Sequence, residues 1–273
     1  MRLREILQAL AEGRITVEEA EREVRLTALA EVGSKGLLDL GRELRAGVPE
    51  VILGEGKEPD VFKSLFLRTL RECGRALASR VDPEQAEAVL SSIPEGYEAE
   101  YREDARMLIA RRKGTRPKPT GGRVGVITAG TSDIPVAEEA KAVAEEMGCE
   151  VYTAYDVGVA GVHRSIQAVR EMVSRDVDAI VVVAGREGAL PSVVAGLVDV
   201  PVIAVPASGG YGMGAGGIGA LMAMLQTCSL GVAVVNIDAG VQAGAVAALI
   251  ANRAAKFRKE SSKTSRYGDK INV

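Results

Sequence analysis

The chain has 273 residues, of which 47% are hydrophobic and 26% charged, and its formal net charge is −3. This length favours two domains, and the small net charge excludes a general affinity for nucleic acid. Three widely spaced cysteines fit neither a disulfide framework nor a zinc site, and no run of about 18 apolar residues occurs. We therefore expect a cytoplasmic protein with no membrane segment.

The first part of the chain predicts a small mixed α/β domain. Apolar residues at helical spacing indicate a helix before Gly13, and a capping-box pattern at residues 16–19 indicates a second helix that ends near Gly33. A strand at 48–53, a helix at 59–73, a strand at 76–79 and a helix at 83–90 should follow. Residues 97–112 fit a helix and a strand equally well, so both stay open.

Residues 113–122 have the composition of a linker, with two prolines, three glycines and no apolar side chain. We place the N-terminal domain at residues 1–118, a second domain at 119–257 and a polar tail that frays at 258–273. In the second domain we expect strands at 124–128, 151–155, 179–183, 202–205 and 232–237. Helices are expected at 136–147, 165–173, 192–197, 218–225 and 243–255. This alternation predicts an α/β fold with a doubly wound parallel sheet.

The loops after the predicted strands hold candidate functional residues, because open parallel sheets bind ligands there. Thr131, Ser132 and Asp133 follow the first strand, so they either cradle an anion or only cap the next helix. His163 and Arg164 open the following helix. A lone histidine is more often structural, whereas Arg164 beside it could bind a phosphate.

Three further segments are expected to meet at the same end of the sheet. Glu187 follows the strand at 179–183, and residues 206–217 form a glycine-rich loop whose amides can approach a ligand closely. Cys228 lies where a helix passes into a strand; it is either a small buried hydrophobe or a nucleophile activated by a neighbouring charge. Cys73 and Cys149 lie inside apolar patterns and are expected in the core.

With these residues in view, the C-terminal half resembles the PurE superfamily. The Gly-Ser-x-Ser-Asp loop, the Ala-His-Arg element and the Ala-Gly-Gly-Ala-Ala-His-Leu-Pro-Gly segment of that superfamily correspond to residues 130–133, 161–164 and 184–192. The resemblance implies a PurE/flavodoxin-like domain and, with the small residues at 243–255, a homo-octamer. The proton-shuttle histidine of the purine enzyme falls at Ala189, which argues against aminoimidazole ribonucleotide chemistry by that route.

Over essentially its whole length the chain is similar to the LarB family, pyridinium-3,5-biscarboxylic acid mononucleotide synthase, which begins synthesis of the nickel-pincer nucleotide cofactor. The matching segments are residues 48–57, 128–135, 187–194 and 228–238. The family commonly has methionine where Arg186 stands, and a Val-Gly-Tyr-Gly segment where this chain has Gly209-Gly210-Tyr211-Gly212.

The resemblance implies that the protein adds carbon dioxide or bicarbonate to the ring of nicotinic acid adenine dinucleotide and releases AMP. The expected catalytic residues are Cys228 as nucleophile, Glu187 as base, and Asp133. The expected substrate-binding residues are Thr131, Ser132, His163, Arg164, Ser208, Gly209, Gly210, Tyr211, Gly212, Asn236 and Asp238. Magnesium would assist the anhydride hydrolysis, although the sequence identifies no ligands for it. A PurE-type purine mutase and a non-catalytic nucleotide-binding protein are the alternatives.

Overall fold

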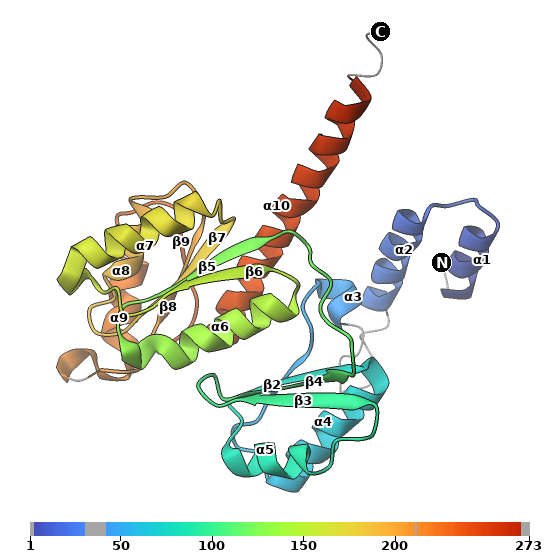
Figure 1. Ribbon diagram of the computed structural model, residues 1–273, viewed down its shortest axis with the longest axis horizontal. Helices are drawn as coiled ribbons and strands as arrows, with labels where there is room; N and C mark the ends of the chain where they lie inside the picture. Colours follow the sequence, from blue (N-terminus) through green and yellow to red (C-terminus); the bar gives the residue numbers. More distant parts are fainter. Residues whose placement is uncertain (1–2, 31–41, 211, 269–273) are drawn as a thin grey trace.

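The computed structural model describes residues 3–30, 42–210 and 212–268, which form two α/β units packed against each other (Figure 1). The N-terminal unit contains α1 (Leu3–Ala11), α2 (Val17–Ala30), α3 (Arg42–Ala46), β1 (Val51–Leu53), α4 (Pro59–Cys73), β2 (Arg75–Ser79), α5 (Pro83–Leu90), β3 (Tyr97–Arg102) and β4 (Met107–Arg112). Its sheet has the order β1-β2-β4-β3, in which β1 and β2 are parallel and the other pairs antiparallel. This confirms the smaller mixed domain.

Local signals explain how the helices of this unit begin and end. α4 ends at Gly74, whose φ of 72° allows its N–H to donate to the carbonyl of Leu70. α5 begins with a capping box, in which the Asp82 side chain accepts from the Gln85 N–H and the Gln85 side chain accepts from the Asp82 N–H. The helices predicted at 59–73 and 83–90 are therefore confirmed with their bounds.

The structure decides the alternative left open for residues 97–112 and corrects some other expectations for this unit. Residues 97–112 form the β3–β4 hairpin, because only a strand can bury alternate residues of this segment in the two cores that lie on either side of the sheet. The strand expected at 48–53 shortens to β1, and α3 was not predicted. Cys73 is exposed at the end of α4, whereas Cys149 is buried as expected. The predicted helix end near Gly33 lies outside the described residues.

The C-terminal unit alternates strands and helices as predicted. It contains β5 (Arg123–Thr128), α6 (Ile134–Glu146), β6 (Glu150–Ala154), α7 (Val162–Ser174), β7 (Ala179–Ala184), α8 (Leu190–Ala195), β8 (Val202–Pro206), α9 (Ile218–Leu225), β9 (Val232–Val234) and α10 (Gly240–Gly268). The five strands are all parallel in the order β6-β5-β7-β8-β9. The doubly wound parallel sheet is therefore confirmed.

Helices cover both faces of this sheet. Val181 and Val183 of β7 pack against α6 and α10, whereas Ile180 and Val182 pack against the face formed by α7, α8 and α9. α6 and α10 touch closely because Gly244 leaves no room for a side chain against the Ala140 carbonyl. The small residues of α10 are thus used inside the chain, so they are no longer a reason to expect an oligomer. None of the described helices combines the length and apolar character that a membrane span requires.

The polar tail was expected to fray from residue 258, but its first part is helical. α10 continues to Gly268 and projects away from the rest of the molecule (Figure 1). Arg258 forms an ion pair with Asp178 and donates to the carbonyl of Gly121, which fixes the helix where it leaves the sheet.

The two units share one hydrophobic core cluster and a buried ion-pair network. Met107 and Ile109 of β4 belong to the same cluster as the buried residues of α6 and α10. Beside them, Glu146 at the end of α6 forms an ion pair with Arg111 at 2.9 Å, and its main-chain carbonyl accepts a hydrogen bond from Arg75 at 2.7 Å. The N-terminal unit is therefore held firmly against α6, whose first turn lies at the candidate site.

Candidate active site

The loops at the carboxyl ends of the parallel strands surround a cavity of about 560 Å³. They follow β5, β6, β7 and β8, and most of the residues that line the cavity are glycine, alanine or serine. The lining residues are Ala129, Gly130, Ser132, Asp133, Gly158, Val159, Ala160, Ala184, Gly185, Arg186, Glu187, Ala189, Leu190, Gly209 and Gly210. We call this space, which the loops surround, the ring cavity.

Asp133 holds two of these loops together. Its carboxylate is 3% exposed and accepts from the N–H groups of Gly130, at 2.9 Å, and of Gly185. Burial raises the pKa of Asp133, and the two N–H donors act in the opposite direction by stabilising the ionised form. Gly185 also lies so close to the loop after β8 that a side chain there would meet the Gly209 carbonyl at 2.5 Å. Asp133 thus organises the cavity that it lines.

Glu187 is the exposed carboxylate of the ring cavity. It follows Arg186, which has a left-handed φ of 52°, and precedes the turn at Gly188, where a side chain would collide with the main chain of Ala220. The tight turn presents Glu187 at the cavity rather than in α8. Ala189 also lines the cavity, and its methyl group can neither donate nor accept a proton.

A second cavity of about 340 Å³ lies between the two units, and we call it the domain cavity. Its lining residues are Glu55, Arg80, Ala105, Arg106, Ser132, Pro135, Val136, Glu139, Ala207, Ser208, Gly209 and Asp238. It shares Ser132 and Gly209 with the ring cavity. Asp238 accepts from the Ser208 N–H at 2.8 Å, which joins the loops after β8 and β9. Of the predicted substrate-binding residues, Ser132, Ser208, Gly209, Gly210 and Asp238 therefore line one cavity or both.

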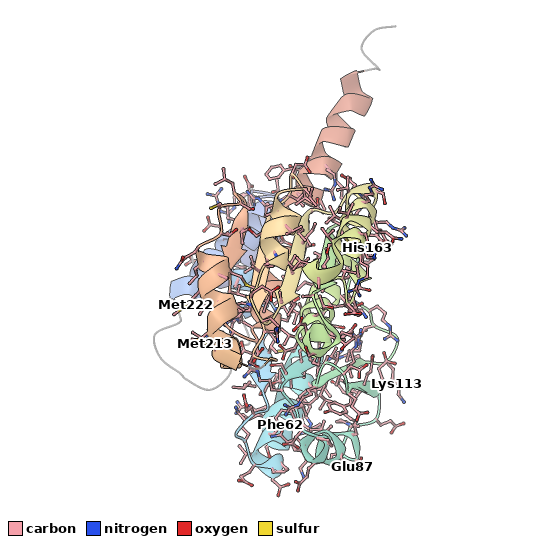
Figure 2. The ribbon with its side chains drawn as sticks, turned by 90° about the vertical axis from the view of Figure 1, so that its left-hand side faces the viewer. Phe62, Glu87, Lys113, His163, Met213 and Met222 are labelled. Carbon is pink, nitrogen blue, oxygen red and sulfur yellow. The ribbon has the colours of Figure 1, made fainter. Side chains whose placement is uncertain are left out.

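Four other predicted residues line neither cavity, although all are exposed. They are Thr131, His163, Arg164 and Asn236. Arg164 pairs with Asp156 at 3.0 Å, and Asn236 accepts from the N–H of Ile237. Figure 2 labels His163, which is exposed in the first turn of α7. Gly212 is exposed and begins a 3₁₀ turn (Gly212–Gly217), and Tyr211 lies outside the described residues.

We expected Cys228 to meet Glu187 and the glycine-rich loop at the ligand-binding end of the sheet. Within one chain it does not lie there, so that expectation is wrong. It is exposed in the loop that joins α9 to the amino end of β9. Three residues later, the Gly231 carbonyl accepts from Val202, the first residue of β8. Loops from helix to strand lie at the amino edge of a parallel sheet, whereas Glu187 lies at the carboxyl edge.

Comparisons with known proteins agree with this architecture. Residues 123–269 match the AIR carboxylase family model, and residues 31–113 match the LarB/PurE-like N-terminal domain. The chain is a LarB/PurE-like protein of the AIR carboxylase family. An uncharacterized protein of Methanocaldococcus jannaschii is 46% identical over 253 residues, covering 91% of this chain and 96% of that protein.

Two N5-carboxyaminoimidazole ribonucleotide mutases are similar to the C-terminal part of this LarB/PurE-like protein. The one from M. jannaschii is 36% identical over 124 residues, covering 45% of this chain and 74% of the mutase. The one from Thermotoga maritima is 28% identical over 154 residues, covering 55% of this chain and 85% of the mutase. Each mutase is thus similar to about half of this chain.

Sequence reasoning missed four of the five charged residues that line the domain cavity: Glu55, Arg80, Arg106 and Glu139. One signal for Glu139 was available, because it falls between Ala137 and Ala140 on the buried face of the helix predicted at 136–147. A charge on an apolar helix face needs a partner or a function. The two arginines carried no such pattern, since they lie in turns that only the packed structure brings to α6.

Glu139 is a buried carboxylate with an altered acidity. It is 6% exposed, lines the domain cavity with Arg80, Arg106 and Asp238, and accepts from the Val241 N–H at the start of α10. Burial raises its pKa from 4.5 to about 7, although the neighbouring arginines oppose this change.

This pKa predicts that stability depends on pH. The folded chain holds the Glu139 proton more tightly than the unfolded chain, so the free energy of unfolding should fall as pH rises from 4.5 to about 7. Glu139→Gln should lack this slope and exceed the wild type by on the order of 2 kcal/mol near pH 8. Urea titrations across this range measure the difference, and Glu87→Gln, at an exposed position of α5, is the control. Parallel pH profiles for wild type and Glu139→Gln would contradict the assignment.

Within the described parts of the chain, no three histidine, cysteine or acidic side chains converge so that they could hold a metal ion. The described residues therefore do not fit a protein-held magnesium ion.

Proposed function

We propose that this LarB/PurE-like protein carboxylates the pyridinium ring of nicotinic acid adenine dinucleotide and hydrolyses its phosphoanhydride, giving pyridinium-3,5-biscarboxylic acid mononucleotide and AMP. The observation that carries the proposal is Glu187, an exposed carboxylate in a cavity bounded by glycine amides, in a chain that also has the LarB-type N-terminal domain. The amides of Gly209 and Gly210 are available for the ring carboxylate.

The proposed chemistry needs a nucleophile, because an electron-poor pyridinium ring does not attack carbon dioxide. The Cys228 thiolate adds to a ring carbon beside the nitrogen and forms a C–S bond, which leaves an enamine with a nucleophilic carbon. That carbon bonds to carbon dioxide, Glu187 accepts the proton from the resulting tetrahedral carbon, and the C–S bond breaks to restore the aromatic ring and the thiolate. Water then cleaves the phosphoanhydride.

In this proposal the thiolate comes from a neighbouring copy of the chain. Cys228 and Glu187 lie at opposite edges of the sheet in one chain, so a single copy is an incomplete site. α9 beside Cys228 exposes Ile218, Met222 and Leu225, and contiguous exposed apolar side chains mark interaction surfaces. We therefore propose a homo-oligomer, of the octameric kind that the PurE resemblance implies, in which this surface is covered.

A PurE-type mutase is the second candidate, supported by the named relatives. Ala189 opposes it, because a methyl group stands in the cavity where the purine enzyme has its proton shuttle. We propose that any magnesium enters with the phosphates of the substrate, in keeping with the described side chains.

One assay distinguishes the proposed carboxylase from a purine mutase and from a binding protein without activity. The purified protein should convert nicotinic acid adenine dinucleotide and isotopically labelled bicarbonate into AMP and a labelled dicarboxylated mononucleotide, which mass spectrometry identifies. The purine carboxyamino-ribonucleotide should give no product under the same conditions. Conversion of the purine nucleotide alone would replace the proposal by the mutase, and failure of both would leave a binding protein.

A further inference from the structure

Both units supply charged side chains to the domain cavity, and the arginines come from the N-terminal unit alone. Arg80 and Arg106 belong to the N-terminal unit, whereas Glu139 and Asp238 belong to the PurE-like unit. Guanidinium groups bind phosphate oxygens, and carboxylates accept hydrogen bonds from ribose hydroxyls. A ligand with both groups, a nucleoside monophosphate, complements this lining.

Three of these side chains stand on strained backbone. φ is 51° at Arg80, 47° at Arg106 and 53° at Asp238, in the left-handed region that residues with a side chain rarely adopt. Such conformations cost stability and cluster at ligand sites, where the surrounding structure holds them in place. Arg80 is already paired with Glu55 at 2.9 Å, but both side chains are exposed, so a phosphate can replace Glu55 at little cost.

The domain cavity adjoins the ring cavity at a shared boundary, which we call the ridge. Ser132 and Gly209 line both cavities, and they lie so close that a side chain on Gly209 would be 3.5 Å from the Ser132 hydroxyl. Both residues are small, so a ligand can cross between them.

We propose that the domain cavity binds the nucleoside monophosphate half of the substrate that the reaction releases. The N-terminal unit then supplies the arginines of the leaving-group subsite, the pyridinium half occupies the ring cavity, and the phosphoanhydride crosses the ridge. This assignment rests on the proposed function, because a substrate made of two nucleotides is what requires two adjoining cavities.

Calorimetric titration of the full chain with AMP alone tests the subsite independently of catalysis. Asparagine tolerates a left-handed φ, so Arg106→Asn and Arg80→Asn remove a guanidinium without adding backbone strain. We expect each to weaken AMP binding roughly tenfold or more. Nicotinic acid mononucleotide should bind these variants as it binds the wild type. Arg68→Ala, an arginine on α4 that lines neither cavity, is the matched control.

The AMP titrations either support or overturn the proposed subsite. Wild-type AMP affinity in both asparagine variants, or no AMP binding by the wild type, would overturn the subsite. Arginine-dependent AMP binding without any carboxylation would support the subsite and reject the proposed reaction instead. If Arg106→Asn does not fold, Arg106→Gly gives the same test, because glycine adopts the φ of 47° freely.

Discussion

Cys228→Ala is expected to reduce carboxylation of nicotinic acid adenine dinucleotide by at least about a thousandfold while the protein stays folded. The loss follows because the pyridinium ring becomes nucleophilic only after a thiolate has added to it. Folding should be unaffected, since Cys228 is exposed and its replacement by alanine leaves no buried cavity. Initial rates with labelled bicarbonate measure the effect, and thermal unfolding verifies the fold.

Two further variants distinguish chemistry from packing. Cys228→Ser preserves the shape but should also fail, because a hydroxyl has a much higher pKa than a thiol and is a weak nucleophile at neutral pH. Cys73→Ala is the matched control, as Cys73 is another exposed cysteine at the end of a helix. Unimpaired carboxylation by Cys228→Ala would reject the covalent mechanism even if the overall reaction were correct.

The separation of Cys228 from Glu187 adds an experiment that the sequence alone did not suggest. Cys228→Ala and Glu187→Gln should each be inactive, but mixed oligomers contain some sites that combine an intact cysteine from one copy with an intact glutamate from another. Random mixing should restore roughly a quarter of wild-type activity. No recovery after subunit exchange would show that both residues must come from the same chain.

The fold was largely predictable because its signals are local. Apolar runs for β5, β7 and β8, together with proline and glycine at helix ends, are set by residues a few positions apart. The loops at Asp133, Glu187 and Gly209 were also predictable, since they follow strands of one parallel sheet. The hairpin at 97–112 was not, because its strand character depends on burial between two cores that are distant in sequence.

The parts of the site that escaped prediction depend on topology and on contacts between the units. Cys228 lies near the functional segments in sequence, yet a helix-to-strand loop falls at the opposite edge of a parallel sheet. Arg80 and Arg106 reach the site only because the N-terminal sheet packs on α6. The small residues of α10 pack against α6 of the same chain, which a sequence cannot tell from packing against a helix of another copy.

The packing of the two units depends on Glu146. Its side chain is 2% exposed, with one oxygen 2.9 Å from Arg111 and the other 3.4 Å from Arg75. Both arginines come from the N-terminal sheet. A buried charge that loses its partner keeps the cost of desolvation without the compensating attraction.

Glu146→Ala is therefore expected to lower the free energy of unfolding by about 3–5 kcal/mol, because it leaves Arg111 buried without its carboxylate. Glu145→Ala is the control: Glu145 pairs with Arg102 across the same junction, but its side chain is 32% exposed. Ion pairs nearer the surface contribute at most about 1 kcal/mol, so the free energy of unfolding of this variant should be close to that of the wild type. Urea denaturation of the three proteins gives the comparison. Equal losses in the two variants would mean that the Glu146 pairs contribute no more than an ion pair at the surface, and that the apolar cluster alone holds the two units together.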